Sequence, residues 1–177
     1  MGIINRPPPV KLFCRLLFTP QGLLEEAKAR LLEAYGPVDV QSKPTALSAP
    51  TDDTDEMGPD VERCFVAFFG LVDPEGLASV KVVTAQVEDH LSVGGQRTVI
   101  IDPGYVTRDQ LMVAVAKEAA HRTYLGRGVH AELTYRWQDG GFEPLEWTQA
   151  DYREPDQRDF FSALRSRYLE QLADRPA

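Results

Sequence analysis

The sequence lacks any apolar run long enough to cross a membrane. Its longest runs, Cys64 to Val72 and Val99 to Ile101, are far shorter than the roughly 20 residues that a spanning helix needs. The first six residues are too short and too polar for a secretory signal. We therefore expect a cytoplasmic protein with no membrane partner.

Cysteine is also scarce, and the common cofactor motifs are missing. Cys14 and Cys64 are the only cysteines, and each lies inside an apolar run without a Cys-x-x-Cys pair. We expect both to be small buried hydrophobic residues and not redox groups. The sequence has no Walker loop, no G-x-G-x-x-G after a strand and no H-E-x-x-H, so no cofactor is expected.

Positive charge is in short supply, yet it gathers in one place. The net charge is −8, which argues against an extended nucleic-acid surface because phosphate contacts need a basic face. Even so, the stretch Lys117 to Leu133 holds two of the three histidines, His121 and His130, beside Arg122 and Arg127. A local basic cluster on an acidic protein favours a small anion over a polyanion.

The order of apolar runs and helical patterns predicts an α+β fold. A ferredoxin-like βαββαβ core is expected, extended by a helix, a β-hairpin and a C-terminal helix. Residues 1–9 are expected to form a flexible N-terminal tail, and residues 10–177 a single α+β domain. The expected core strands cover residues 11–18, 38–40, 61–72 and 97–101, and the expected core helices run from Thr19-Pro20 to Gly36-Pro37 and from Asp73 to Gly94-Gly95.

The second half of the chain is expected to begin with a helix. Asp102-Pro103-Gly104 is predicted to end a strand in a turn, and Thr107 to Gln110 matches a capping box that opens a third helix reaching Tyr124. Further elements are expected as a strand at 129–137, a tight turn at Asp139-Gly140, a return strand at 142–147 and a helix at 156–172. Ser42 to Asp60 reads as a long acidic loop, with or without a strand in its middle.

The predicted third helix would carry Lys117, His121 and Arg122 on its polar arc. Those groups are either a solvated face with a Glu118–Arg122 pair, or the wall of a pocket. In the second case His121 is the candidate acid or base, and Asp102 is a further catalytic candidate as an orienting or second-site carboxylate. The predicted ligand-binding residues are Lys117, Arg122, Tyr124, Arg127, His130 and Glu132.

The number and kind of sites stay open at this point. About 15 to 20 Å of helix would separate the Asp102 turn from His121, so one site or two are equally compatible with the sequence. A metal site from His121, His130 and either Glu132 or Asp102 is an alternative, but the spacing is not diagnostic and no metal is assigned.

Two functions fit these patterns. The first is binding of a small anionic ligand, phosphorylated or carboxylated, at the end of the third helix, with or without catalysis by His121. The second is a non-catalytic protein-interaction module that uses the acidic 42–60 loop and the late hairpin with Trp137, Phe142 and Trp147. An open sheet edge on that hairpin would favour a homodimer.

Several short stretches, in order along the chain, carry a family resemblance. They are Pro9–Phe13, Glu56–Gly58, Leu71–Pro74, Ile101–Tyr105, His121–Gly126, Ala131-Glu132, Trp147-Thr148 and Asp151-Tyr152. In these stretches the chain resembles an uncharacterised bacterial family, catalogued as domain-of-unknown-function family 4416. It departs from that pattern at Asp52 to Thr54 and at His130, where aromatic residues are expected. The resemblance implies a single cytosolic domain and brings no activity, substrate or catalytic residue.

Overall fold

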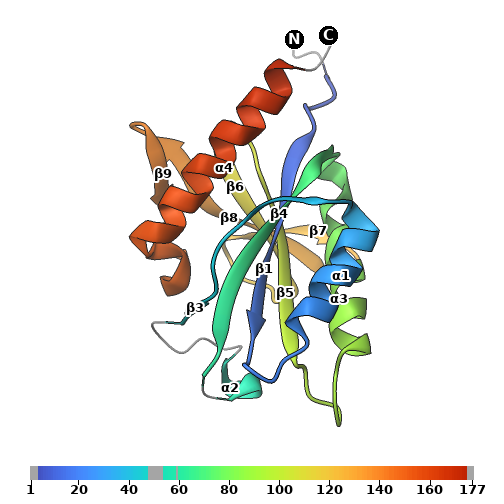
Figure 1. The fold of residues 1–177 in the computed structure, drawn as a ribbon. Helices are drawn as coiled ribbons and strands as arrows, with labels where there is room; N and C mark the ends of the chain where they lie inside the picture. The colour runs from blue at the N-terminus through green and yellow to red at the C-terminus, as the bar shows by residue number, and fades with distance from the viewer. Residues whose placement is uncertain (1–3, 48–53, 59, 175–177) are drawn as a thin grey trace.

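The computed structural model describes residues 4–47, 54–58 and 60–174. Nine strands form one sheet in the order β2-β4-β1-β5-β6-β8-β7, with β3 paired to β4 and β9 paired to β8. All pairings are antiparallel. Helices α1 and α3 lie on one face of this sheet and α4 lies on the other (Figure 1). The described residues therefore form an α+β fold built on a large antiparallel sheet.

The centre of the sheet comes from the first half of the chain. It contains β1 (Val10–Phe18), β2 (Val38–Gln41), β4 (Glu62–Val72) and β5 (Val99–Val106). The strands predicted from the apolar runs of this half are confirmed, but β5 begins at Val99 and continues beyond its predicted end at Ile101. Every residue of β1 is buried, because β1 has a neighbour on each edge and a helical layer over each face.

Two helices cover the first face of the sheet. They are α1 (Leu24–Tyr35) and α3 (Leu77–His90), which follows the short turn η1 (Pro74–Gly76). Both helices were predicted. However, α1 begins at Leu24 and not at Thr19-Pro20, because Thr19 to Gly22 close a turn in which the Gly22 N–H donates to the Thr19 carbonyl at 2.8 Å.

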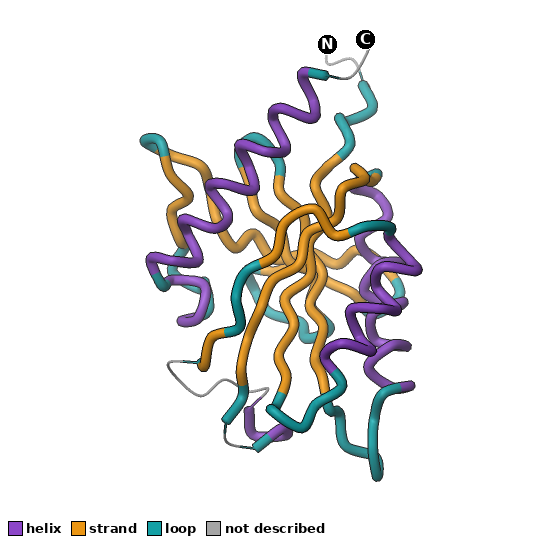
Figure 2. The backbone as a smooth tube through the Cα atoms, in the orientation of Figure 1, coloured by secondary structure: helices purple, strands orange, loops and turns teal. Residues whose placement is uncertain are grey.

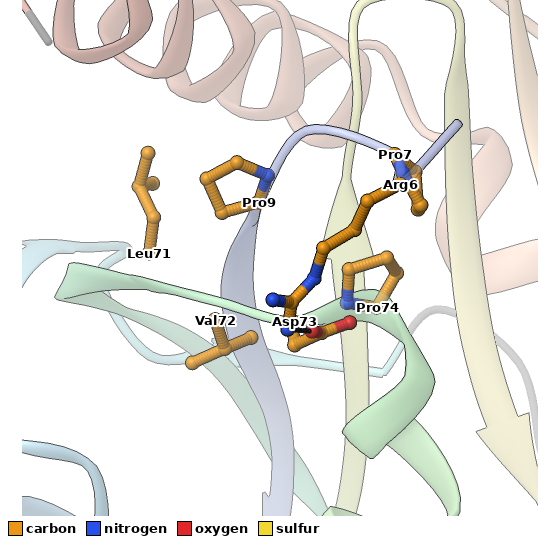
Figure 3. A pocket seen from close by; sticks show the side chains of 7 residues that line it. All are labelled: Arg6, Pro7, Pro9, Leu71, Val72, Asp73 and Pro74. Carbon is orange, nitrogen blue, oxygen red and sulfur yellow. Dashed lines mark hydrogen bonds and ion pairs between the residues drawn. The ribbon is translucent and has the colours of Figure 1, made fainter. Parts of the chain in front are cut away.

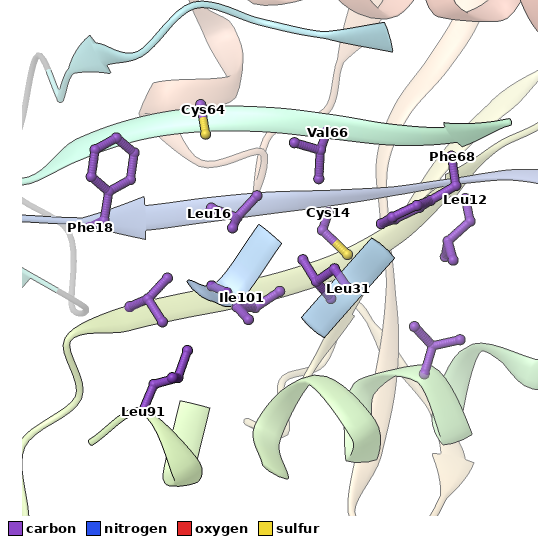
Figure 4. Packing of buried hydrophobic residues seen from close by; sticks show 13 residues of the cluster. Leu12, Cys14, Leu16, Phe18, Leu31, Cys64, Val66, Phe68, Leu91 and Ile101 are labelled. Carbon is purple, nitrogen blue, oxygen red and sulfur yellow. The ribbon is translucent and has the colours of Figure 1, made fainter. Parts of the chain in front are cut away.

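The core under α1 and α3 holds both cysteines. Figure 4 shows Cys14 of β1 next to Leu31 of α1, within a buried cluster that also contains Leu12 and Leu16 of β1. Cys14 and Cys64 are 0% and 1% exposed, which confirms them as small buried hydrophobic residues. Burial raises the pKa of both thiols, that of Cys64 to about 11, so neither is a reactive thiolate at neutral pH.

The opposite face is covered by α4 (Pro155–Ala173), which the sequence predicted and which follows η2 (Ala150–Arg153). The core between this face and α4 is aromatic, and the ring centroids of Phe13 and Phe161 lie 4.9 Å apart. Figure 2 shows the end of α4 beside the segment that leads into β1, where the Tyr168 hydroxyl donates to the Pro9 carbonyl. No helix in the described ranges has the length and apolar character of a membrane span.

The prediction of a third helix after Thr107 is wrong. Its residues form β6 (Gln110–Val115), a loop and β7 (Arg122–Gly126). In β6, Leu111 and Val113 pack toward α4 while Ala114 packs toward α3. A strand buried on both faces shows no alternation of apolar and polar residues, so its apolar run also fits one arc of a helix. The polar arc proposed for Lys117, His121 and Arg122 therefore does not exist.

The apparent capping box closes a hairpin instead. The Thr107 hydroxyl accepts from the N–H groups of Asp109 at 3.2 Å and Gln110 at 3.0 Å, within the turn between β5 and β6. A threonine oxygen can bond N–H groups two or three residues ahead in a turn as well as at a helix start, so the two signals look alike in sequence.

The turn expected at Asp102-Pro103-Gly104 does not form, because β5 runs straight through it. Gly104 pairs with Phe13 on one side and with Val113 on the other. A Cβ atom at Gly104 would lie 2.3 Å from the Met112 carbonyl oxygen and 2.6 Å from Cζ of Phe13. Glycine is therefore required here by the close approach of neighbours and not by a reversal of the chain.

The late hairpin largely follows its prediction. It consists of β8 (Val129–Gln138) and β9 (Gly141–Pro144), joined by Asp139 and Gly140 with φ of 52° and 86°. Both φ values are positive, as a two-residue hairpin turn requires. The return strand ends at Pro144, earlier than the predicted Trp147.

The acidic loop and the N-terminal tail are described only in part. Residues 42–60 contain β3 (Thr45–Ala46) and α2 (Thr54–Met57), while residues 48–53 and 59 of this loop and residues 1–3 of the tail lie outside the described residues.

A ferredoxin-like sandwich has helices on one face of its sheet, whereas here the sheet has nine strands and helices on both faces.

Replacing Gly104 by alanine tests the account of β5. We expect a loss of about 1 to 3 kcal/mol in the free energy of unfolding, because the added methyl group overpacks against Phe13 and the Met112 carbonyl. Gly76→Ala is the matched control, since Gly76 has φ −73° and nothing within 4 Å of an added Cβ. Denaturant unfolding measures both, and equal stability of the two variants would contradict the account.

Candidate functional site

Five of the residues singled out from the sequence gather around β7 and β8. In the register of this pair Arg122 lies opposite Glu132, and Tyr124 lies opposite His130. Residues directly opposite in an antiparallel pair share one face of the sheet. His121 comes immediately before β7, so it lies beside Arg122 and Glu132. The hairpin register, and not a helix, brings these side chains together.

Glu132 is the centre of this cluster. It is 2% exposed, and its Oε2 accepts from Nε of Arg122 at 2.8 Å and lies 3.1 Å from Nε2 of His121. A carboxylate paired with arginine can only accept hydrogen bonds, so Nε2 of His121 must carry the hydrogen. In the neutral imidazole the lone pair therefore sits on Nδ1, and in the imidazolium Nδ1 becomes a donor.

Trp147 covers one face of the His121 ring. The two ring centroids lie 5.1 Å apart with an interplanar angle of 14°, which is a stacked arrangement. The indole Nε1–H donates to the Leu133 carbonyl at 2.8 Å. Trp147 was expected on an interaction surface. Its contact with His121 was not predicted, because no local spacing links residues so far apart in the chain.

The other predicted ligand-binding residues divide between the cluster and its surroundings. Tyr124 is 61% exposed, and its ring lies 5.2 Å from that of His130. Lys117 joins the cluster through its main chain, because its carbonyl accepts from Nη1 of Arg122 at 2.9 Å. Arg127 instead donates to the Ser79 hydroxyl of α3 at 3.0 Å, so it is not part of this cluster.

Asp102 belongs to a different group, a buried ion network. Its Oδ2 accepts from Nη2 of Arg15 at 2.6 Å, and its Oδ1 accepts from Nζ of Lys81 at 3.0 Å. Lys81 comes from α3 and Arg15 from β1, so the carboxylate joins the helical layer to the sheet. All three residues are buried.

The network also closes an open strand edge. Pairing of β5 with β6 begins only at Gly104, so the backbone before it has no strand on that side. There the Ile101 N–H donates to Oε1 of Glu88 at 2.8 Å, and Nζ of Lys81 donates to the Ile101 carbonyl at 2.9 Å. Two side chains of α3 thus replace a neighbouring strand and satisfy buried backbone groups.

The charge state of Asp102 follows from these contacts. Burial alone would raise its pKa, but the ion pairs with Lys81 and Arg15 outweigh that effect and hold the pKa well below its usual range. A carboxylate of this kind is a weak base and carries no proton to donate near neutral pH. Its geometry is that of a structural anion.

The network continues under α4. Nη1 of Arg15 donates to Oδ2 of Asp151 at 2.8 Å and to the Gln149 side-chain oxygen at 3.0 Å, and Nη1 of Arg63 donates to the Asp151 carbonyl at 2.8 Å. None of these side chains was predicted as a site residue from the sequence: Arg15, Lys81, Asp151 and Arg63. The sequence could have predicted two of them as buried charges, because Arg15 and Arg63 each lie within or beside an apolar run of a predicted strand.

A pocket of about 340 Å³ lies elsewhere, between the N-terminal segment and the end of β4. Figure 3 shows Arg6 and Asp73 pointing toward one another across it, and these two side chains form an ion pair. Its other lining residues are Pro7, Pro9, Leu71, Val72 and Pro74. None of the site residues predicted from the sequence lines this pocket.

The metal alternative finds no geometric support. Within the ranges that the structure describes, no three His, Cys, Asp or Glu side chains come together as a metal-binding group. Asp102 also lies on β5 and His130 on β8, with β6 between these two strands.

Replacing Asp102 by asparagine tests the buried network. Loss of the anion leaves Arg15 and Lys81 buried without their shared partner, so we expect a cost of about 3 to 5 kcal/mol in unfolding free energy at pH 7. Asp89→Asn on the exposed side of α3 is the control and should change stability by less than about 0.5 kcal/mol.

The network also predicts a pH dependence. The folded pKa of Asp102 lies below its unfolded value of about 4, so its contribution is complete above that pH and is lost as the pH falls further. Acid unfolding below about pH 4 should therefore be steeper for the unaltered protein than for Asp102→Asn. Parallel curves for the two proteins would show that the network does not stabilise the fold in this way.

The chain is similar to one protein family in the ranges given below. No curated protein and no solved structure matches the chain. A family model described as "Domain of unknown function (DUF4416)" matches residues 8–168, which include β1 to β9 and both the Glu132 cluster and the Asp102 network. The match covers most of the sequence, so the chain belongs to the DUF4416 family.

Proposed function

We propose that this protein binds a small anion, phosphorylated or carboxylated, on the face of β7 and β8 that carries His121, Arg122 and Glu132. The observation that carries the proposal is the shared Glu132 carboxylate, which holds Nε2 of His121 and Nε of Arg122 together. In this arrangement Nδ1 of His121 is the atom that meets the ligand.

The charges of the cluster couple binding to protonation of His121. With neutral His121, the charges of Arg122 and Glu132 cancel. With protonated His121 the three groups carry one net positive charge, and Nδ1–H can donate a charge-assisted hydrogen bond to an anionic oxygen. The anion should therefore bind more tightly in the pH range where His121 is protonated.

The same geometry supports acid–base chemistry by His121. Neutral His121 presents the Nδ1 lone pair as a base, and protonated His121 returns the proton from the same atom. Glu132 fixes the ring and stabilises the imidazolium, a role that a buried carboxylate can fulfil beside a histidine. Asp102 is not part of this proposal, because it is neutralised by Arg15 and Lys81.

The interaction-module alternative stays a prediction with less support. Trp137 and Phe142 pack in the core under α4, and Trp147 stacks on His121, so the aromatic residues of the late hairpin contact their own chain. Part of the acidic 42–60 loop lies outside the described residues. The edge strand β7 carries exposed Tyr124, which is the feature that still favours a homodimer.

A ferredoxin-like arrangement is proposed only for the first part of the sheet. The strand order β2-β4-β1-β5, with α1 and α3 on one face, supports it for these elements. In this view, β6 to β9 and α4 are additions that build the anion-binding face on β7 and β8.

Binding of inorganic phosphate tests the proposed function. Calorimetric titration near pH 6 should show binding by the unaltered protein and a loss of roughly 10- to 100-fold in affinity for His121→Gln, which removes one charge-assisted hydrogen bond. His90→Gln is the matched control, because His90 is exposed at the end of α3 and should bind normally. Citrate serves as a carboxylate probe in the same design.

The proposal fails if neither phosphate nor citrate binds to the unaltered protein. It also fails if His121→Gln and His90→Gln bind the probe equally well.

A further inference from the structure

The segment Leu145–Arg153, here called the strap, fills a gap beside β8. The outer edge of β8 pairs with β7 up to Glu132 and with β9 from Tyr135 onward. The carbonyls between these two pairings accept from the strap instead. Nε1 of Trp147 donates to the Leu133 carbonyl at 2.8 Å, and the Thr148 hydroxyl donates to the Thr134 carbonyl at 2.6 Å.

Arg153 holds the strap in one shape. Its guanidinium donates to the carbonyls of Thr148 at 2.8 Å and Glu146 at 3.0 Å, and also to the carbonyl of Leu145. One rigid, planar group thus collects several carbonyls of the same segment. Arg153 is itself exposed and is not a member of the aromatic core under α4.

The other end of the strap is fixed to the buried network. Gln149 and Asp151 both accept from Nη1 of Arg15. The Nε and Nη2 groups of the same arginine donate to Asp102. The strap therefore runs from the ion network in the centre of the sheet to the ring of His121. Trp147 is the strap residue that touches the proposed binding site.

We infer that Trp147 is a positioning residue for His121, and that the strap, held by Arg153 and Arg15, keeps the indole in place. This inference rests on the proposed function of His121. Glu132 fixes one ring nitrogen, but this hydrogen bond does not by itself fix the tilt of the imidazole plane about the axis from Cγ to Nε2. The stacked indole fixes the plane of the ring, so Nδ1 points in one direction before the anion arrives.

A competing view is that Trp147 only fills space beside β8. The two views differ in what they predict for binding. A space-filling residue affects stability alone, whereas a positioning residue also sets the affinity for an anion and its dependence on pH.

The experiment compares variants of the whole chain by phosphate titration over a pH series, with a melting curve for each. Trp147→Leu removes the ring, and we expect about tenfold weaker phosphate binding, the size of an aromatic contact converted to affinity. Trp147→Phe keeps a stacking ring and should restore most of the affinity. In Trp147→Leu the rise in affinity at low pH should also be smaller than in the unaltered protein.

Arg153→Ala provides a second route that leaves the aromatic residues intact. It should weaken phosphate binding in the same direction, while Arg136→Ala, an exposed arginine on β8, serves as control and should bind normally. This variant keeps the test decisive if Trp147→Leu does not fold.

Each outcome separates the two claims. Absence of both phosphate and citrate binding by the unaltered protein overturns the proposed function and this inference with it. If citrate alone binds, the same variants are titrated with citrate. Phosphate binding that depends on His121 but is unchanged in Trp147→Leu and Arg153→Ala, whatever their melting temperatures, overturns only the positioning role.

Discussion

The carboxylate of Glu132 is the group on which the organisation of the β7–β8 face depends. It lies buried on β8 and accepts from both Arg122 and His121, so it joins a guanidinium and an imidazole that lie side by side. Because it can only accept, it fixes where the hydrogen of His121 resides. The antiparallel register of β7 and β8 supplies this contact directly, so the site forms as the sheet forms.

A second set of charges supports the site from the centre of the sheet. Asp102 joins Lys81 of α3 to Arg15 of β1, and Arg15 in turn holds Gln149 and Asp151 of the strap. Buried ion pairs contribute little net stability, but removing one partner is costly. We interpret the network as the element that fixes the strap relative to the sheet, and through the strap the position of Trp147.

The sequence predicted the parts of the fold whose signals are local. Helices α1, α3 and α4 and the turn at Asp139-Gly140 follow from periodicity and turn chemistry. The helix predicted from Thr107 to Tyr124 was wrong for two reasons. The strand β6 is buried on both faces, so it shows no alternation of apolar and polar residues. The hairpin turn before it has the same sequence pattern as a helix cap. Arg122 and Glu132 were placed in one site for the wrong reason, since a strand pair and not a helix joins them. Trp147 and Arg15 needed the strand order, which local patterns do not contain.

The organisation of this face requires that Glu132 hold His121 in the form with hydrogen on Nε2. Long-range ¹H–¹⁵N NMR of the histidine side chains distinguishes the two neutral tautomers directly, with the exposed His90 as an internal reference. We expect His121 to show the Nε2–H form alone at alkaline pH, and the Nδ1–H form to appear beside it in Glu132→Ala, as in the exposed His90. Hydrogen on Nδ1 of His121 in the unaltered protein would contradict this, because Nδ1 would then have no lone pair to serve as the proposed base.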